Sequence, residues 1–300
     1  MTYILVLVPV LLNVAFITLL ERKILAYRQY RVGPNKVSFI GILQPIADAV
    51  KLFLNQSEGP FSSNYFIYYF SPAVRVLLVL VLWGTYPSFT GNHSYTFTIL
   101  LILVILRLGV YPLLLAGWSS NRKYALLGGL RGVAQTISYE IRLALIMLAF
   151  LVYLSSYNLE TLIKNSFFTS LLILAPFRIF LWVVSCIAET NRTPFDFSEG
   201  ESELVSGFNI EYGSGGFALI FIAEYARIYF LSLLRVSIIL GTSPSSILTH
   251  FMVISLVFFW IWRRSTLPRF RYDLLIRLAW KDFLPTALGM LEISLFVIYF

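Results

Sequence analysis

The chain has 300 residues, of which 58% are hydrophobic and only 13% are charged, and its net charge is +8. A soluble domain carries about 25% charged residues, so this composition excludes a soluble enzyme, a disordered chain and a nucleic-acid-binding domain. The mean hydropathy of +0.80 instead predicts a polytopic membrane protein whose apolar exterior is covered by lipid.

Eight apolar segments are long enough to cross a bilayer as α-helices, which takes about 20 residues. They are residues 3–25, 67–86, 97–118, 134–153, 169–188, 217–240, 247–262 and 281–300. No positive region precedes the first segment and no small-residue cleavage site follows it, which favours a retained span over a cleaved signal. We therefore expect an all-α bundle of eight transmembrane helices forming one integral membrane domain over residues 1–300.

The loops between these segments differ sharply in charge. Loops 21–66, 119–133, 189–216 and 263–281 hold many Lys and Arg residues, whereas loops 87–96, 154–168 and 241–246 contain only Lys164. Because cytoplasm-side loops collect positive charge, we expect the basic loops to lie inside and both termini outside. An even number of spans agrees with this orientation.

The first inner loop contains a Gly-Pro-Asn turn and then a mostly apolar helix from Gln44 to Asn55, with Pro45 in its first turn. Its polar residues share one helical face: Gln44, Asp48, Lys51 and Asn55. A narrow polar stripe on an apolar helix predicts the lining of a cavity. The alternative is an amphipathic helix that lies on the membrane surface.

The third inner loop is acidic, although its neighbours are basic. Six carboxylates accompany the single cation Arg192: Glu189, Asp196, Glu199, Glu201, Glu203 and Glu211. A solvated acidic face is one interpretation. In a partly dry site, however, clustered carboxylates raise one another's pKa and exchange protons near neutral pH.

Several charged residues fall inside or at the ends of the apolar segments: Arg107, Glu140, Arg142, Arg178, Glu224, Arg227 and Arg235. Such groups are costly in lipid and usually face a protein interior or a water-filled path. Glu224 and Arg227 are three residues apart, so a structural ion pair is the plain alternative there. Glu140, Glu189 and Glu224, on three different spans, predict a line of proton-exchanging carboxylates.

Redox chemistry is not expected in this chain alone. One cysteine, Cys186, and two histidines, His93 and His250, are too few to ligate an iron–sulfur cluster. The arginine-rich segment 263–273 fits either lipid phosphates or an acidic partner surface.

The loop motifs resemble one known family. They are ERK at 21–23, LQPIAD at 43–48, AETNRTPFD at 188–196, EGESELVSGFNIEY at 199–212 and PRFRYD at 268–273. Over essentially the whole chain, the sequence is similar to the subunit 1 family of respiratory NADH:ubiquinone oxidoreductase, complex I, in its mitochondrially encoded form.

This resemblance implies a multi-pass subunit of the mitochondrial inner membrane, with its termini in the intermembrane space and its basic loops towards the matrix. It implies a chamber that admits ubiquinone as substrate, with no cofactor bound by this chain alone and with FMN and iron–sulfur clusters in partner subunits. The implied partners are other membrane-arm subunits, the hydrophilic quinone-site subunits and inner-membrane lipids, cardiolipin among the candidates; no nucleic acid is implied.

The resemblance also assigns residues to roles. The chamber or loop-anchoring positions are Arg22, Arg31, Gln44, Asp48, Arg192, Arg269 and Arg271. The acidic loop beside the chamber contains Asp196, Glu199, Glu201, Glu203 and Glu211. The buried proton path contains Glu140, Glu189 and Glu224. Some bacterial relatives have an acidic residue on the third span, where this chain has Arg107.

Two other classes of protein share some of these features. A stand-alone ion transporter would explain the charges inside the spans but not the one-sided basic loops, and ion flux through the reconstituted chain would reveal it. A membrane anchor of a related hydrogenase complex would be revealed by the hydrophilic subunits that co-purify with it.

Overall fold

The computed structural model describes residues 2–87, 95–169, 176–200, 204–205, 207–243 and 246–299, and within these ranges every regular element is helical. The α-helices are α1 (Thr2–Arg28), α2 (Gln44–Leu54), α3 (Tyr65–Gly84), α4 (Thr98–Leu108), α5 (Val110–Ser119), α6 (Lys123–Leu154), α7 (Leu159–Thr169), α9 (Pro176–Glu189), α11 (Ser214–Leu240), α12 (Ile247–Thr266), α13 (Tyr272–Arg277) and α14 (Leu284–Tyr299). Short 3-10 turns, η1 (Phe39–Gly41) and η2 (Gly207–Asn209), and one π-helical segment, η3 (Leu278–Phe283), complete them. The predicted all-α class is confirmed.

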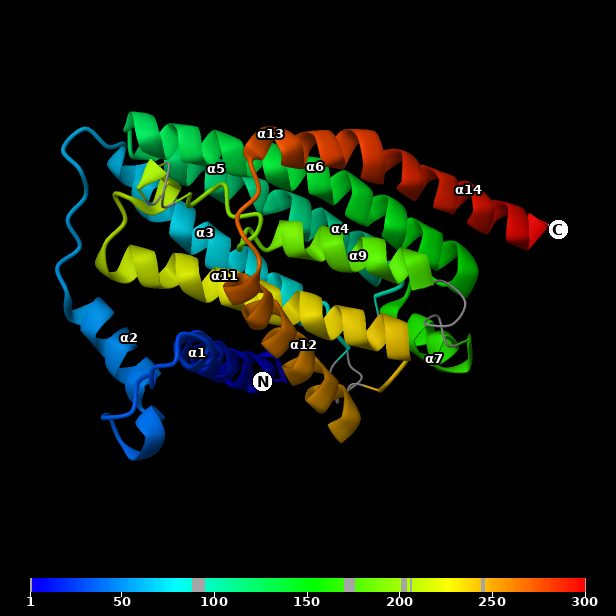
Figure 1. Ribbon diagram of the computed structural model, residues 1–300, viewed down its shortest axis with the longest axis horizontal. Helices are drawn as coiled ribbons and strands as arrows, with labels where there is room; N and C mark the ends of the chain where they lie inside the picture. Colours follow the sequence, from blue (N-terminus) through cyan, green and yellow to red (C-terminus); the bar gives the residue numbers. More distant parts are fainter. Residues whose placement is uncertain are drawn as a thin grey trace.

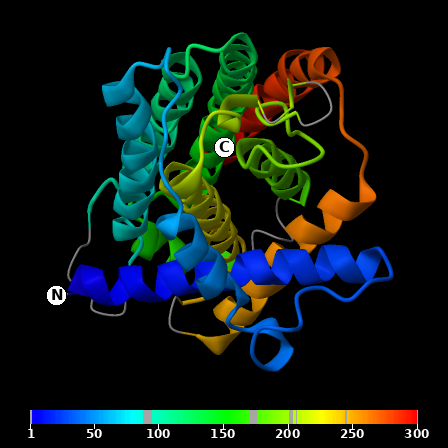
Figure 2. The ribbon, with the colours of Figure 1, turned by 90° about the vertical axis from the view of Figure 1, so that its left-hand side faces the viewer.

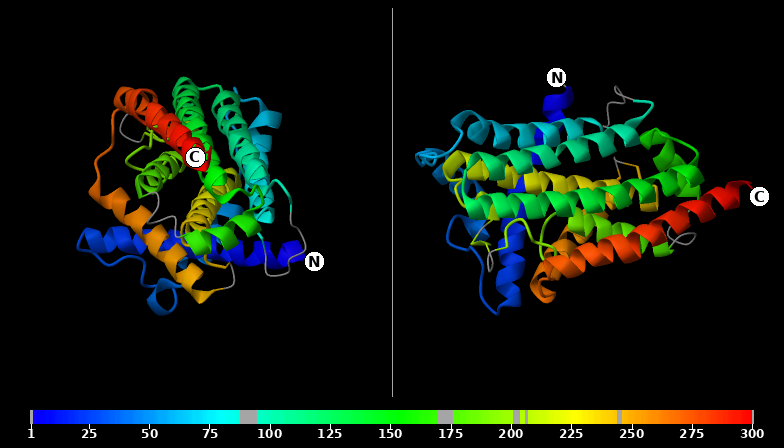
Figure 3. Two further views of the ribbon diagram at one scale, coloured as in Figure 1. Left: turned by 90° about the vertical axis from the view of Figure 1, so that its right-hand side faces the viewer. Right: turned by 90° about the horizontal axis from the view of Figure 1, so that it is seen from above.

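Two long helices organise the bundle (Figure 1). Helix α6 packs against α5, α9 and α14, while α11 packs against α3, α12 and α1. Most of the long helices run lengthwise beside one another, but α1 lies crosswise to them, as Figures 2 and 3 show. The crosswise α1 contacts α11, α12 and α2 and thereby closes one side of the bundle.

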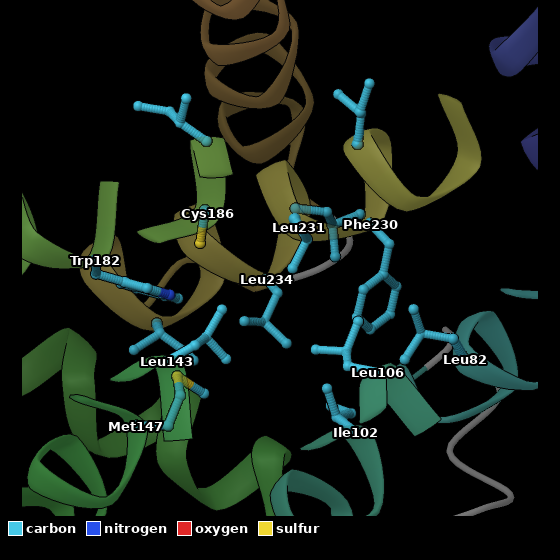
Figure 4. Close-up of a cluster of buried hydrophobic side chains, with 14 of the residues drawn as sticks. Leu82, Ile102, Leu106, Leu143, Met147, Trp182, Cys186, Phe230, Leu231 and Leu234 are labelled. Atoms are coloured by element: carbon cyan, nitrogen blue, oxygen red, sulfur yellow. The ribbon is translucent and has the colours of Figure 1, made fainter. Parts of the chain in front are cut away.

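The core lies where α6, α9 and α11 meet α3 and α4 (Figure 4). Met147 and Trp182 face Leu234 and Phe230, with Ile102 on the far side of the cluster. These side chains are almost completely buried. Burying a large apolar side chain contributes about 1.5–3 kcal/mol, so this cluster fixes how α9 and α11 present their charged residues.

Five helical stretches within the described residues are long and apolar enough to cross a membrane. They are residues 65–84, 98–119, 123–154, 214–240 and 247–266. Each overlaps a predicted span, although the stretch 98–119 is divided at Gly109 into α4 and α5. The other three predicted spans fall on α1, α9 and α14, and residues 170–175 of the fifth lie outside the described part of the chain.

Two loops predicted from the sequence contain helix instead. Helix α6 begins at Lys123, although residues 119–133 were expected to form an inner loop. Helix α7 occupies most of the expected outer loop 154–168. Its N-terminus is marked by Asn158, whose Oδ1 accepts a hydrogen bond from the backbone N–H of Glu160 at 3.0 Å. Asparagine is a favoured N-cap residue, so this signal was present in the sequence.

Glycines explain why the early part of α6 is helical. A Cβ at Gly117 of α5 would lie 2.9 Å from the carbonyl oxygen of Ala125, and a Cβ at Gly128 would lie 2.8 Å from the Cα of Gly207. Small residues permit such close helix packing in membranes. Gly207 has φ +58° and a Cβ there would overlap the Ser198 carbonyl. These contacts hold the acidic loop against α6.

Helix α2 begins at Gln44, as the sequence indicated, with Pro45 in its first turn. It packs against α1 and α11. The apolar side chains of Ile46, Val50 and Phe53 nevertheless remain exposed on the surface of the isolated chain. A helix with this much exposed apolar surface requires a partner or lipid to cover it.

Candidate functional site

Glu224, in the middle of α11, is held between two arginines. Its Oε1 lies 3.0 Å from Nη2 of Arg75 on α3, and its Oε2 lies 2.9 Å from Nη2 of Arg192 in the acidic loop. All three side chains are almost fully buried. Because a buried charge without its partner is strongly unfavourable, this arrangement ties the acidic loop to two spans.

Arg192 also connects Glu224 to the rest of the acidic loop. Its Nη1 lies 3.8 Å from Glu199 Oε2, and the Glu199 Oε1 accepts a hydrogen bond from Asn209 Nδ2 at 3.1 Å. The Glu199 backbone N–H donates to Asp196 Oδ1 at 3.3 Å. Asp196 in turn pairs with Arg269 at 3.4 Å, which links this loop to the loop before α13.

The electrostatic environment raises the pKa of two carboxyls in this loop, Glu199 and Asp196. Burial, together with the negative charge of Glu224, raises the pKa of Glu199 to about 8. Burial also raises the pKa of Asp196, although Arg269 and Arg192 oppose that effect. Burial acts to lower the pKa of Arg192, but Glu224, Tyr225 and Glu199 outweigh it, so the pKa rises and Arg192 remains a cation.

The raised pKa of Glu199 predicts a pH-dependent loop. Between about pH 4.5 and about pH 8 the folded protein holds a proton on Glu199 that the unfolded chain has lost, so stability falls as the pH rises through this window. We expect amide hydrogen exchange in the loop, corrected for its intrinsic pH dependence, to be up to about a hundredfold faster at about pH 9 than at about pH 6, because each pH unit within the window corresponds to a factor of about ten. The variant Glu199→Gln should lack this increase, and an unchanged pH response in that variant would contradict the assignment.

A second group of charges lies where α4, α6, α9 and α11 meet. Glu189, at the end of α9, is buried, and its Oε1 lies 3.2 Å from Nη1 of Arg227 on α11. Glu140 of α6 lines the same small cavity as Glu189, together with Arg107 and three leucines. Neither Glu140 Oε1 nor Glu189 Oε2 has a hydrogen-bond partner among the described residues. Two carboxyl oxygens are therefore available at one buried cavity.

A third feature is a cavity of about 30 Å³ between α1, α9, α11 and α12, enough for about two water molecules. Six apolar side chains line one part of it: Ile17, Ile187, Ile228, Val257, Trp260 and Ile261. Arg192 and Glu21 are among its polar lining residues. Glu21 accepts a hydrogen bond from Tyr225 at 2.7 Å and pairs with Arg264 of α12. The cavity is thus an apolar space that directly contacts the Glu224–Arg192 network.

The other predicted chamber residues fall into separate places. Arg22 of α1 pairs with Asp48 of α2, and Gln44 donates to Asp48 at 2.8 Å, so these three come together. Of the remaining chamber residues, Arg31 contacts Gln29 and Arg271 contacts Asp273, both at the surface. Glu211 of the acidic loop pairs with Arg122 at 3.4 Å. Glu201, Glu203 and His93 lie outside the described residues.

Sequence reasoning missed some of the partners in these networks. Arg75 lies within an apolar span, where a single charge is a signal for a functional or paired group, but it was not singled out. The expected alternative of a Glu224–Arg227 pair is not what the structure shows, because Glu224 binds Arg75 and Arg192 while Arg227 binds Glu189. Within the described ranges, no cluster of three His, Cys, Asp or Glu side chains is arranged to hold a metal ion.

A helical bundle with membrane-length apolar helices and buried charge networks defines an integral membrane protein. The sequence model of the NADH dehydrogenase family matches residues 1–295. "NADH-ubiquinone oxidoreductase chain 1" of Aedes aegypti is 54% identical over 288 residues, covering 96% of this chain and 92% of that relative. The protein of the same name from Locusta migratoria is 48% identical over 302 residues, covering 100% of this chain and 96% of that relative. The one from Heterololigo bleekeri is 46% identical over 293 residues, covering 96% of this chain and 94% of that relative. The chain belongs to this family, which confirms the resemblance found in its motifs.

Proposed function

We propose that this chain is a membrane subunit of the proton-translocating NADH:ubiquinone oxidoreductase of the mitochondrial inner membrane. In this role it forms much of the ubiquinone access chamber and couples quinone reduction to a path of buried carboxylates. The names of its relatives support the first part. The observation that carries the second part is Arg192, which lines the apolar cavity and also binds Glu224 and Glu199.

The walls of the cavity suit a quinone. Ubiquinone combines a long apolar tail with a small polar head, so its passage requires apolar walls with few polar groups. The cavity between α1, α11 and α12 has an apolar side, which includes Ile228 and Val257. Its charged side suits the polar head and contains Glu21, Arg192, Arg263 and Arg264. In the assembled enzyme this space would widen or continue into partner subunits, which carry FMN, the iron–sulfur clusters and most of the headgroup site.

Coupling follows from charge balance. Reduction of one quinone to quinol consumes two electrons and two protons, so protons leave the neighbouring acids as the quinol forms. Interactions between charges are strong at low dielectric. Arg192 lines the cavity and binds Glu224 and Glu199, so a change of charge in the cavity alters the electrostatic environment of both carboxyls. Glu224 lies one turn from Arg227 on α11, and Arg227 leads to Glu189 and from there to Glu140. These three carboxylates form the proposed proton path.

Placement in the membrane uses all eight predicted spans. Helix α1 has 27 residues and is therefore about 40 Å long, enough to cross a hydrocarbon core of about 30 Å. Because α1 lies crosswise to the lengthwise helices (Figure 3), both sets cross one bilayer only if each is strongly tilted. Helices α9 and α14 complete the set, and α2 serves as the extra amphipathic helix, with its exposed apolar face towards lipid or a partner subunit. Both termini then lie in the intermembrane space, and the basic loops face the matrix, the hydrophilic subunits and anionic lipid such as cardiolipin.

Narrowing the cavity tests this proposal. Val257 of α12 is 3% exposed and lines the cavity, whereas Ile254 on the same helix is 57% exposed. Because overpacking a filled space costs about 1–3 kcal/mol, we expect Val257→Phe to raise the KM for ubiquinone about tenfold. Electron transfer from NADH to a water-soluble acceptor that draws electrons from the partner subunits should not change. Equal KM values for Val257→Phe and the control Ile254→Phe would contradict the proposed chamber.

A further inference from the structure

Arg227 makes an unusually close approach to a glycine between two helices. Its Nη1 binds Glu189, while a Cβ built at Gly109 would overlap Nη2 and lie 3.1 Å from Cζ. Gly109 has φ −61° and ψ −16°, a conformation that any residue adopts easily. The backbone conformation therefore does not require glycine at this position. The limited space does, because a Cβ would overlap the Arg227 guanidinium and would also lie 3.0 Å from the carbonyl oxygen of Leu106.

The opposite side of Glu189 faces Glu140. Glu189 Oε2 and Glu140 Oε1 lack hydrogen-bond partners among the described residues, and both side chains line one cavity. Its volume of about 10 Å³ is close to the minimum that one water molecule requires. Buried polar atoms are rarely left unsatisfied, so these two oxygens suit a shared proton or a bridging water.

We propose that Arg227 is a positioning residue that holds Glu189 through Oε1 and directs Oε2 towards Glu140, and that Gly109 provides the space this arrangement requires. The inference rests on the proposed function, because it assumes that Glu140 and Glu189 exchange protons. In the step itself, the proton leaves the Glu140 carboxyl and is taken up by Glu189 Oε2, so the negative charge passes to Glu140. Arg107, which lines the same cavity, is then the cation beside it.

The variants Arg227→Gln, Arg227→Lys and Gly109→Ala test this arrangement in the assembled enzyme. Alanine favours helix more than glycine does, so a loss of coupling in Gly109→Ala would come from steric displacement of the guanidinium or of the Leu106 carbonyl, 3.0 Å from the added Cβ. Comparison with Arg227→Gln separates these two causes. Gly289→Ala in α14 is the matched control, because a Cβ there meets nothing within 4 Å. The measurements are coupled turnover, protons moved per quinone reduced, and the infrared carbonyl band of protonated carboxyl groups.

We expect Arg227→Gln and Gly109→Ala to lower coupled turnover about tenfold, the loss that corresponds to one hydrogen bond to a charged group. Both should also gain an infrared band from protonated Glu189, which disappears when Glu189→Gln is added. Arg227→Lys should restore part of the coupling because it keeps the positive charge, and Gly289→Ala should behave as the wild type.

The outcomes separate this inference from the function on which it rests. Full coupling in Arg227→Gln, together with a loss in Glu189→Gln, would overturn the positioning role and leave the proton path intact. Full coupling in Glu189→Gln would overturn the proton path itself. If the Gly109→Ala variant fails to assemble, the comparison of Arg227→Gln with Arg227→Lys still tests the positioning role. Equal losses of coupled turnover in these two variants would exclude a role for the positive charge.

Discussion

Glu224→Gln is expected to cause a large loss of assembled enzyme. The neutral amide takes the carboxylate away from Arg75 and Arg192, two buried cations, and Arg192 retains the longer contact with Glu199 at 3.8 Å. Breaking a buried ion pair from one side typically costs about 3–5 kcal/mol, and here a single carboxylate serves two guanidinium groups. We therefore expect assembled enzyme to decrease at least tenfold, about 1.4 kcal/mol or more of effective stability, and the remaining enzyme to be impaired in turnover and in proton pumping.

The amount of assembled complex measures the effect of Glu224→Gln on assembly. The ubiquinone-linked turnover per complex measures its effect on catalysis. Glu160→Gln is the control, because it makes the same chemical change at an exposed pair, 3.0 Å from Lys164 Nζ on the same helix. Exposed pairs of this kind contribute about 0.3–0.5 kcal/mol. Normal assembly together with normal pumping in Glu224→Gln would remove Glu224 from both roles.

The second large effect is expected at Glu189. Glu189→Gln preserves the shape of the side chain, and its amide oxygen can still accept a hydrogen bond from Arg227, but it cannot take up and release a proton. Positioned proton transfer contributes about 100-fold or more to a reaction rate, so proton pumping should fall by about that factor and ubiquinone-linked turnover should fall with it. The number of protons taken up by sealed vesicles per NADH oxidised gives the proton-to-electron ratio. A full proton-to-electron ratio would exclude Glu189 from the path.

Most of the helical fold was predictable because lipid imposes a simple rule on sequence. Each span must be apolar over about 20 residues, and the five membrane-length helices of the structure overlap predicted segments. The ends of helices were less predictable. At the glycine-rich start of α6, Gly128 packs closely against Gly207 of η2 and Ala125 against Gly117 of α5, and such tertiary contacts can override local helix propensity.

The site was predictable as a set of residues but not as a set of pairs. The motif around Arg192 and the carboxylates at 140, 189 and 224 identified the groups, since charges in lipid are rare. Their partners depend on which faces of distant helices meet. Arg75 lies nearly 150 residues before Glu224 in the chain, and Glu21 meets Arg264 only because α1 crosses α12. No local pattern in a single sequence specifies such contacts.

Cross-linking with a photoreactive ubiquinone tests most directly whether the quinone passes through this chain beside its buried acids. An analogue with the reactive group near the head should label the cavity wall between α1, α11 and α12, at Ile17, Ile228 or Val257. Excess ubiquinone should suppress that labelling, and narrowing the cavity with Val257→Phe should reduce it. Labelling confined to outward-facing positions such as Ile254, or labelling that ubiquinone does not compete with, would contradict the proposed passage.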